Sequence, residues 1–164
     1  SRKPRPNEIG GKDYHFISRE VFQKRIDEGE FVEWVENYGQ FYGTSVKAIN
    51  DVLNRGKDLL LDIEPRGAKA IKTQFPEAVF VFVLPPSPDE LLKRLKKRGH
   101  ESQEAIKIRF AQANSELKEV LWYDYTIFNE DLETAVLQMI SIYRAEKCKT
   151  KRLRRKIDRV FKIE

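Results

Sequence analysis

Arg2 and Arg5 stand close together at the start of the chain, in the stretch SRKPR. The ring of Pro4 fixes its own backbone angle and restricts the residue before it, so the two guanidinium groups project from a stiffened loop. A guanidinium is always charged and can bind phosphate oxygens through two parallel hydrogen bonds. The pair predicts a phosphate site, and a basic loop without a ligand is the alternative that this short stretch leaves open.

Glu33 lies in the β-rich run EFVEWVENYG and has a side chain whose chemistry suits the reading of a base. A carboxylate accepts hydrogen bonds from both the N1 and the N2 donors of guanine, a pairing that adenine cannot offer. We expect Glu33 on the strand face opposite to Phe31 and Trp34. An outward-facing strand glutamate, like Glu30 and Glu36 nearby, is the alternative.

Two more acids, Asp62 and Glu64, end the apolar run DLLLDIE. An apolar run without polar alternation predicts a buried parallel strand, here over residues 58–64. Ligands of parallel α/β sheets bind at the carboxyl ends of the strands, so both carboxylates are candidates for a site at that edge. The alternative for Asp62 is that it only terminates the strand.

Three arginines, Arg94, Arg98 and Arg109, lie in the basic segment LLKRLKKRGHESQEAIKIRF. Phosphoryl transfer needs cations that close over the transferring group, where they stabilise charge and exclude water. The three arginines are therefore candidates for that role. A solvated basic helix face is the alternative, and we expect it for the lysines of the same segment.

The elements that carry these residues predict one α/β domain. The first third of the chain predicts a small mixed sheet with one helix: a strand at residues 14–18, a helix between Ser18 and Gly29, and two antiparallel strands that meet at Gly39.

From Ser45 onward, helices alternate with apolar strands, which predicts a parallel sheet. Ser87 and Glu90 form the pattern of a capping box at the start of a helix. The predicted helices are 45–56, 65–75, 88–99, 101–121 and 133–149, and the predicted strands are 58–64, 78–86 and 125–131.

Composition excludes several other classes of protein. Cys148 is the one cysteine and there are two histidines, which is too few for a disulfide framework or a zinc-ligand set, and we expect a reducing, cytoplasmic setting. The apolar run AVFVFVLPP is too short to span a bilayer, so we expect no membrane segment. Residues 144–162 hold ten lysines and arginines against two acids, so the basic charge belongs to the tail and nucleic acid is not expected as a partner.

The stretches SRKPR, GKDYHF, EFVEW and FYGTS resemble, in order and spacing, the nucleotide-monophosphate region of guanylate kinases, whose pattern runs T-R-x-P-R-x-G-E, G-x-D-Y-x-F, E-F-x-E and Y-x-Y-G-T. Ser1 stands where that family usually has threonine. The resemblance implies that the GMP phosphate is bound by Arg2, Arg5, Tyr14 and Tyr42. It implies that Glu33 and Thr44 contact the guanine edge, whereas both tyrosines alone would be read as core or edge aromatics.

Later segments continue the resemblance. DLLLDIEPRGA is similar to L-D-I-D-x-Q-G-A, which implies that Asp62 lies near the metal and the phosphates and Glu64 near the GMP base. Glu64 replaces an aspartate, and Arg66 stands at the usual glutamine position. The basic segment resembles the family's lid, and IFNEDL resembles V-N-D-D-L. The implied catalytic residues are Asp62, Arg94, Arg98 and Arg109, and the implied ATP-binding residues are Arg94, Arg98 and Asn129.

The resemblance implies a P-loop NTPase-like nucleoside monophosphate kinase core, which is a parallel sheet with flanking helices. It implies an enzyme that converts ATP and GMP to ADP and GDP with Mg²⁺. The metal is expected to have no direct protein ligand. The implied parts are a GMP-binding lobe at 1–45, core at 46–86, a helical lid at 87–117, and core with a basic C-terminal helix at 118–164.

No G-x-x-x-x-G-K-(S/T) loop occurs in these residues, although the family uses one to bind ATP phosphates. We expect it upstream of Ser1 in a longer protein. Without it, DLLLDIE or its neighbour is expected to expose an unpaired apolar edge, and the 164 residues alone are expected to transfer no phosphate. An inactive guanylate-kinase-like module that binds GMP or phosphorylated proteins is the alternative, and a nucleic-acid-binding protein is a third.

Overall fold

The computed structural model describes residues 1–2, 4, 9–11, 15–37, 39–97 and 102–162. The chain divides into two compact units, Ser1–Ala78 and Val79–Glu164, and each is described by itself. The predictions for Arg5, Tyr14 and Arg98 fall outside the described residues.

The first unit begins with helix α1 (Arg19–Asp27), as predicted. The hydroxyl of Ser18 accepts a hydrogen bond from the amide of Val21 at 3.2 Å and caps the helix. Gly29 follows the helix with φ +68°, a left-handed conformation that glycine adopts without strain. The predicted strand at 14–18 is wrong for residues 15–18, which are irregular because no described segment pairs with them.

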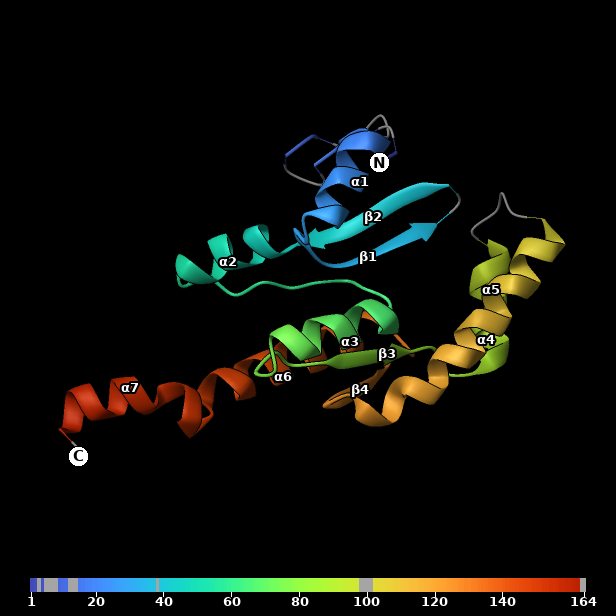
Figure 1. The fold of residues 1–164 in the computed structure, drawn as a ribbon. Coiled ribbons are helices and arrows are strands. Elements are labelled where there is room, and N and C mark those ends of the chain that lie inside the picture. Colours follow the sequence, from blue (N-terminus) through green and yellow to red (C-terminus); the bar gives the residue numbers. More distant parts are fainter. Residues whose placement is uncertain (3, 5–8, 12–14, 38, 98–101, 163–164) are drawn as a thin grey trace. The chain divides into compact units, whose positions relative to one another are not determined.

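Strands β1 (Phe31–Asn37) and β2 (Gln40–Ser45) form the predicted antiparallel hairpin (Figure 1). The rings of Phe22, Phe31 and Phe41 stack on the face that α1 covers, with centroid distances of 4.3 and 5.3 Å from Phe22 to the other two rings. Stacked aromatic rings bury much apolar area in defined orientations, so they hold α1 against the hairpin.

Two further helices complete this unit: α2 (Val46–Asn54), capped by the hydroxyl of Ser45, and α3 (Pro65–Gln74), which contacts β1. Pro65 occupies the first turn of α3, where a missing backbone N–H costs nothing. The predicted strand over residues 58–64 is wrong, since these residues are irregular and Leu60 is 82% exposed. An apolar run becomes a strand only where a neighbour accepts its hydrogen bonds, and no described segment does so.

In the second unit, β3 (Val81–Leu84) and β4 (Tyr125–Phe128) pair in parallel, as predicted from their apolar sequences. An aromatic cluster supports this pair: Phe82 and Trp122 both pack on Tyr123, with ring centroids 4.8 and 4.0 Å from it. Burial, followed by the negative charges of Glu116 and Glu119, raises the pKa of Tyr123 to about 12.

Helices α4 (Pro88–Lys97) and α5 (Gln103–Glu116) contact each other, and a 3₁₀ helix, η1 (Leu117–Trp122), continues α5. Of the predicted capping box, the Ser87 half is present, because its hydroxyl accepts from the amide of Glu90 at 3.2 Å. The side chain of Glu90 binds Arg94.

The chain ends with α6 (Leu132–Cys148) and α7 (Thr150–Phe161). Glu146 is only 5% exposed, although it is charged. It accepts a hydrogen bond of 2.6 Å from the hydroxyl of Tyr125 and lies 2.6 Å from the ammonium of Lys149, so it joins β4 and α6 to the start of α7. The hydrogen bonds from Lys149 and Tyr125 lower the pKa of Glu146. None of the described helices has the length and apolar character needed to cross a bilayer.

We predict that Glu146→Gln lowers the free energy of unfolding at neutral pH by about 1–3 kcal/mol, because Tyr125 and Lys149 lose a buried, charged acceptor. Since the folded pKa of Glu146 is lowered, its contribution is complete above the ordinary pKa of a glutamate and is lost as the pH falls through the folded pKa. Urea unfolding should therefore show a difference between variant and wild type that shrinks in acid. Glu130→Gln, at an exposed position, is the control. A pH-independent difference would contradict the assignment.

Candidate functional site

Glu33 and Thr44 meet on the face of the hairpin opposite to α1. The hydroxyl of Thr44 donates a hydrogen bond of 2.6 Å to Oε1 of Glu33, and the two residues are partners in the strand register. Both side chains are half-buried, so the carboxylate is held in place and yet can be reached. The structure thus brings together the two residues expected at the guanine edge.

An irregularity in β1 makes this meeting possible. Phe31 pairs with Ser45 and Glu33 pairs with Thr44, so the register shifts between Phe31 and Glu33, as in a β-bulge. In a regular strand, Phe31 and Glu33 would share a face. The bulge turns Glu33 to the face opposite to the phenylalanine rings.

Helix α3 bounds the carboxylate on its other side. Gly67, in the first turn of α3, is buried, and a Cβ built on it would lie 3.1 Å from Oε2 of Glu33. Glu64 is the N-cap residue of the same helix, although its side chain makes no capping hydrogen bond. The glutamate that is expected near the GMP base therefore stands at the end of α3 that contacts Glu33. The sequence analysis did not single out Gly67, and the signal for it is a glycine inside a predicted helix.

The residues expected to bind the phosphate are only partly described. The hydroxyl of Ser1 accepts from the amide of Phe41 at 2.9 Å and donates to Oε1 of Gln40 at 3.2 Å, which ties the opening loop to β2. The guanidinium of Arg2 lies over the ring of Phe16, 5.6 Å from its centroid. Tyr42 is half-buried, two residues from Thr44 and so on the same face of β2.

Arg19 is a residue that the sequence analysis missed. Its guanidinium lies 4.3 Å from the centroid of Phe41, donates to the carbonyl of Gly39 at 3.0 Å and pairs with Glu36 at 2.9 Å. These contacts hold the turn of the hairpin to the start of α1. The signal was weak, because a single arginine in the first turn of a helix is common on protein surfaces.

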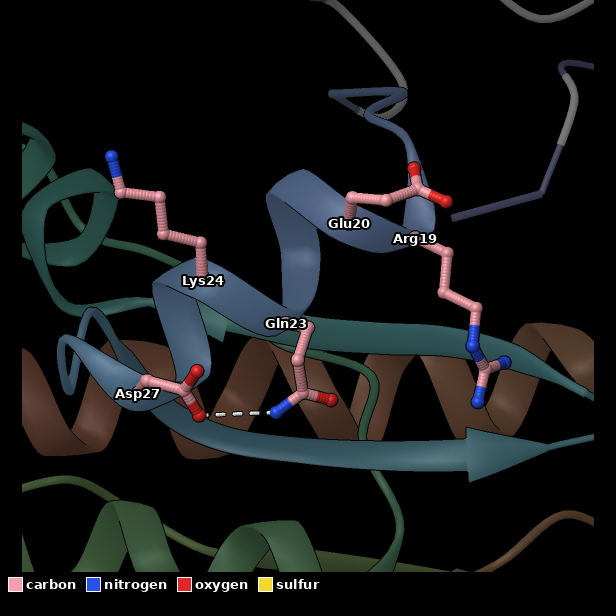
Figure 2. A pocket seen from close by; sticks show the side chains of 5 residues that line it. All are labelled: Arg19, Glu20, Gln23, Lys24 and Asp27. Carbon is pink, nitrogen blue, oxygen red and sulfur yellow. Dashed lines mark hydrogen bonds between the residues drawn. The ribbon is translucent and has the colours of Figure 1, made fainter.

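Arg19 also borders a shallow open pocket on α1 (Figure 2). The pocket is lined by side chains of this one helix, among them Gln23 and Asp27, which bond to each other at 3.1 Å. None of the predicted site residues lines it, so the shape of this surface alone would not have located the Glu33 site.

Asp62 lies exposed in the irregular segment between α2 and α3. Among the described residues, no three histidine, cysteine or acidic side chains are grouped so that they could hold a metal ion. The expected role of Asp62 near a metal and phosphates stays a prediction.

In the second unit, the structure brings Arg94 and Asn129 together. Nη2 of Arg94 donates to the carbonyl of Asn129 at 3.0 Å, while its Nε donates to Oε1 of Glu90 at 3.0 Å. The amide of Asn129 binds the carbonyl of Leu84 at 2.6 Å, so this contact lies at the carboxyl ends of both parallel strands. Arg109 is half-buried on α5, the neighbouring helix.

Nucleoside monophosphate kinases share three features with this chain. They have a carboxylate on a small hairpin, a pair of helices that carry arginines, and parallel strands with polar residues at their carboxyl ends. The family model described as guanylate kinase matches residues 1–146, and the chain belongs to the guanylate kinase family.

Relatives cover the chain almost completely. A guanylate kinase of Syntrophus aciditrophicus (strain SB) is 48% identical over 164 residues, which are 100% of this chain and 79% of that protein. A guanylate kinase of Clostridioides difficile (strain 630) is 46% identical and is matched over 80% of its length. The crystal structure of guanylate kinase from Anaplasma phagocytophilum superimposes with a TM-score of 0.77 at 35% identity, covering 99% of this chain and 82% of that one. These matches establish the P-loop NTPase-like kinase fold.

We predict that Thr44→Val weakens GMP binding by about tenfold, since loss of a hydrogen bond to a charged group costs about 1.5 kcal/mol or more. Calorimetric titration with GMP measures the effect. Thr44→Ser, which keeps the hydroxyl, should retain most of the affinity. Equal affinities for the valine variant and the wild type would show that the hydroxyl does not orient Glu33.

Proposed function

We propose that this chain acts as an ATP:GMP phosphotransferase, which transfers the terminal phosphoryl group of ATP to GMP and releases ADP and GDP. The observation that carries the proposal is the half-buried carboxylate of Glu33, held at 2.6 Å by Thr44 on the hairpin. Relatives that are named guanylate kinase and match the whole chain support it. They favour a catalyst over the inactive binding module.

Glu33 reads the base in this proposal. Thr44 occupies one acceptor position of the carboxylate, and the remaining lone pairs accept from N1 and N2 of guanine. Adenine presents no donor at N1, so an AMP molecule leaves the carboxylate without its partners. Glu64, at the start of α3, supplies a second acceptor near the base.

The phosphate of GMP is held by Arg2, Arg5, Tyr14 and Tyr42. Guanidinium groups bind phosphate oxygens in a bidentate manner, and the phenol hydroxyls add hydrogen bonds. The hydrogen bonds of Ser1 support this role of Arg2, since they anchor the neighbouring backbone to β2.

Transfer is carried out by positioning and charge neutralisation. Arg94, Arg98 and Arg109 bind the phosphoryl group in transit, and Asn129 lies beside the adenine of ATP. The hydrogen bond from Arg94 to Asn129 supports a common ATP site for these two residues. In this scheme residues 1–45 are the GMP-binding lobe, residues 87–117 the lid, and residues 46–86 and 118–164 the core.

Mg²⁺ is proposed to enter with ATP. Magnesium prefers oxygen ligands, keeps several waters and needs only one or two carboxylates beside substrate phosphates. The exposed carboxylate of Asp62 has the donor chemistry that such an ion requires of the protein, through its water shell. The ion would neutralise charge on the phosphates. We propose the cytoplasm as the location.

A protein that carries this chain together with a G-x-x-x-x-G-K-(S/T) loop should form ADP in a coupled assay that depends on GMP, with little turnover of AMP. Glu33→Gln should lower kcat/KM for GMP by roughly a hundredfold, because an amide cannot accept both guanine donors. AMP turnover should change little. Glu30→Gln removes the same charge from an exposed position and is the matched control. A parallel loss for GMP and AMP would refute the reading role of Glu33.

A second prediction concerns the phosphate. Arg5→Met should lower the affinity for GMP by about tenfold or more and leave guanosine binding nearly unchanged, because it removes a charge-assisted contact to the phosphate alone. Calorimetry with both ligands measures this, and Lys47→Met on the exposed side of α2 controls for the lost charge. Equal losses for GMP and guanosine would assign Arg5 a structural role.

A further inference from the structure

Gly67 is a glycine at a place where the backbone does not require one. It lies within α3 and is not among the glycines whose φ is positive. In a helix, alanine is the more stable choice, because glycine loses more backbone freedom on folding. A glycine in this position therefore calls for a reason outside the helix.

The reason is the side chain of Glu33. A Cβ built on Gly67 would lie 3.1 Å from Oε2 of Glu33 and 3.2 Å from its Cδ and Cγ. Ordinary contacts between such atoms are about 3.5–4.0 Å. The three nearest atoms all belong to this one side chain, so an added methyl group would push first against the glutamate.

The glutamate cannot move away without loss. Its Oε1 is bound by the hydroxyl of Thr44 at 2.6 Å, and the register shift in β1 sets the direction in which the side chain leaves the strand. A displacement by a few tenths of an ångström would stretch the hydrogen bond to Thr44 or turn the plane of the carboxylate. Either change would worsen the geometry in which the carboxylate of Glu33 accepts hydrogen bonds from two donors of one base.

Gly43 provides a contrast on the opposite side of the hairpin. A Cβ there would lie 2.9 Å from the carbonyl oxygen of Glu33 and 3.0 Å from the rings of Phe22 and Phe31. These neighbours are backbone and core, which cannot give way cheaply. Gly43 is required by the fold, whereas the atoms nearest to a Cβ on Gly67 belong to a single side chain, that of Glu33.

We propose that Gly67 is a positioning residue for base specificity: its missing side chain lets the carboxylate of Glu33 lie against α3 in the orientation that accepts both guanine donors. The proposal rests on the function proposed above. It names the specificity that depends on Gly67, which is guanine over hypoxanthine. Hypoxanthine keeps the N1 donor and lacks the amino group at C2, so only a carboxylate in the correct orientation distinguishes the two bases by its second hydrogen bond.

The test compares Gly67→Ala with the wild type, both in a protein that also carries a G-x-x-x-x-G-K-(S/T) loop, and uses GMP and inosine monophosphate as acceptors. The ratio of kcat/KM for GMP to that for inosine monophosphate should fall by about tenfold, because the second hydrogen bond is lost. The KM for ATP should change little. The urea midpoint should stay the same or rise, since alanine favours the helix.

Thr73→Ala is the matched control, because it also introduces alanine into α3, at an exposed position whose hydroxyl donates to the carbonyl of Lys69 at 3.1 Å. It should leave the ratio of the two acceptors unchanged. Gly43→Ala should lower the urea midpoint instead.

An unchanged ratio in Gly67→Ala, with an active wild type, would overturn this inference alone. An equal loss for both acceptors, or a failure of Gly67→Ala to fold, would overturn it as well, since the methyl group would then have met something stiffer than Glu33. A wild type without GMP-dependent ADP formation would overturn the proposed function, and this inference with it.

Discussion

The first unit depends on one constraint, which is that a charged carboxylate must be held half-buried between a hairpin and a helix. Thr44 binds one oxygen of Glu33 at 2.6 Å, and α3 approaches the other oxygen at Gly67, where no side chain intervenes. An unpaired charge in such a place would raise the free energy of the folded state. Each neighbour of the carboxylate therefore either donates a hydrogen bond to it or leaves room for it. The bulge in β1, the threonine in β2 and the glycine in α3 each meet one part of this requirement.

The opposite face of the hairpin shows how that polar face is supported. The rings of Phe22, Phe31 and Phe41 stack between α1 and the strands, and Gly43 leaves room for them. Arg19 adds a second attachment, because it lies over Phe41 and binds both Glu36 and the turn at Gly39. The packed aromatic face thus makes the hairpin rigid, and this rigidity holds Glu33 and Thr44 on the other face in a fixed position.

In the second unit, a basic residue is held in place by fixed partners in the same way. Arg94 bonds to Glu90 on its own helix and to the backbone of Asn129 at the end of β4, so the helix that carries it is tied to the carboxyl ends of the parallel strands. Phosphoryl transfer requires little covalent chemistry from a protein and depends on where its cations stand. Two fixed partners hold the guanidinium of Arg94 in one orientation, which would lower the entropic cost of the role proposed for it.

The sequence by itself determined the features that depend on neighbouring residues. Helix starts at Ser18 and Ser87 were readable because a hydroxyl caps its own helix, the Gly39 turn predicted the hairpin, and apolar strands that alternate with helices predicted a parallel sheet. Motif order identified Glu33 and Thr44 as candidates. Only the tertiary structure decided two features of the site: the bulge that brings Glu33 to Thr44, and the contact between Gly67 and Glu33. It also decided that Leu60 is exposed, in a run that predicted a strand, and that Glu146 is buried. Each of these depends on a partner far away in the chain, and whether a backbone or charged group finds such a partner is set by packing, which local sequence does not encode.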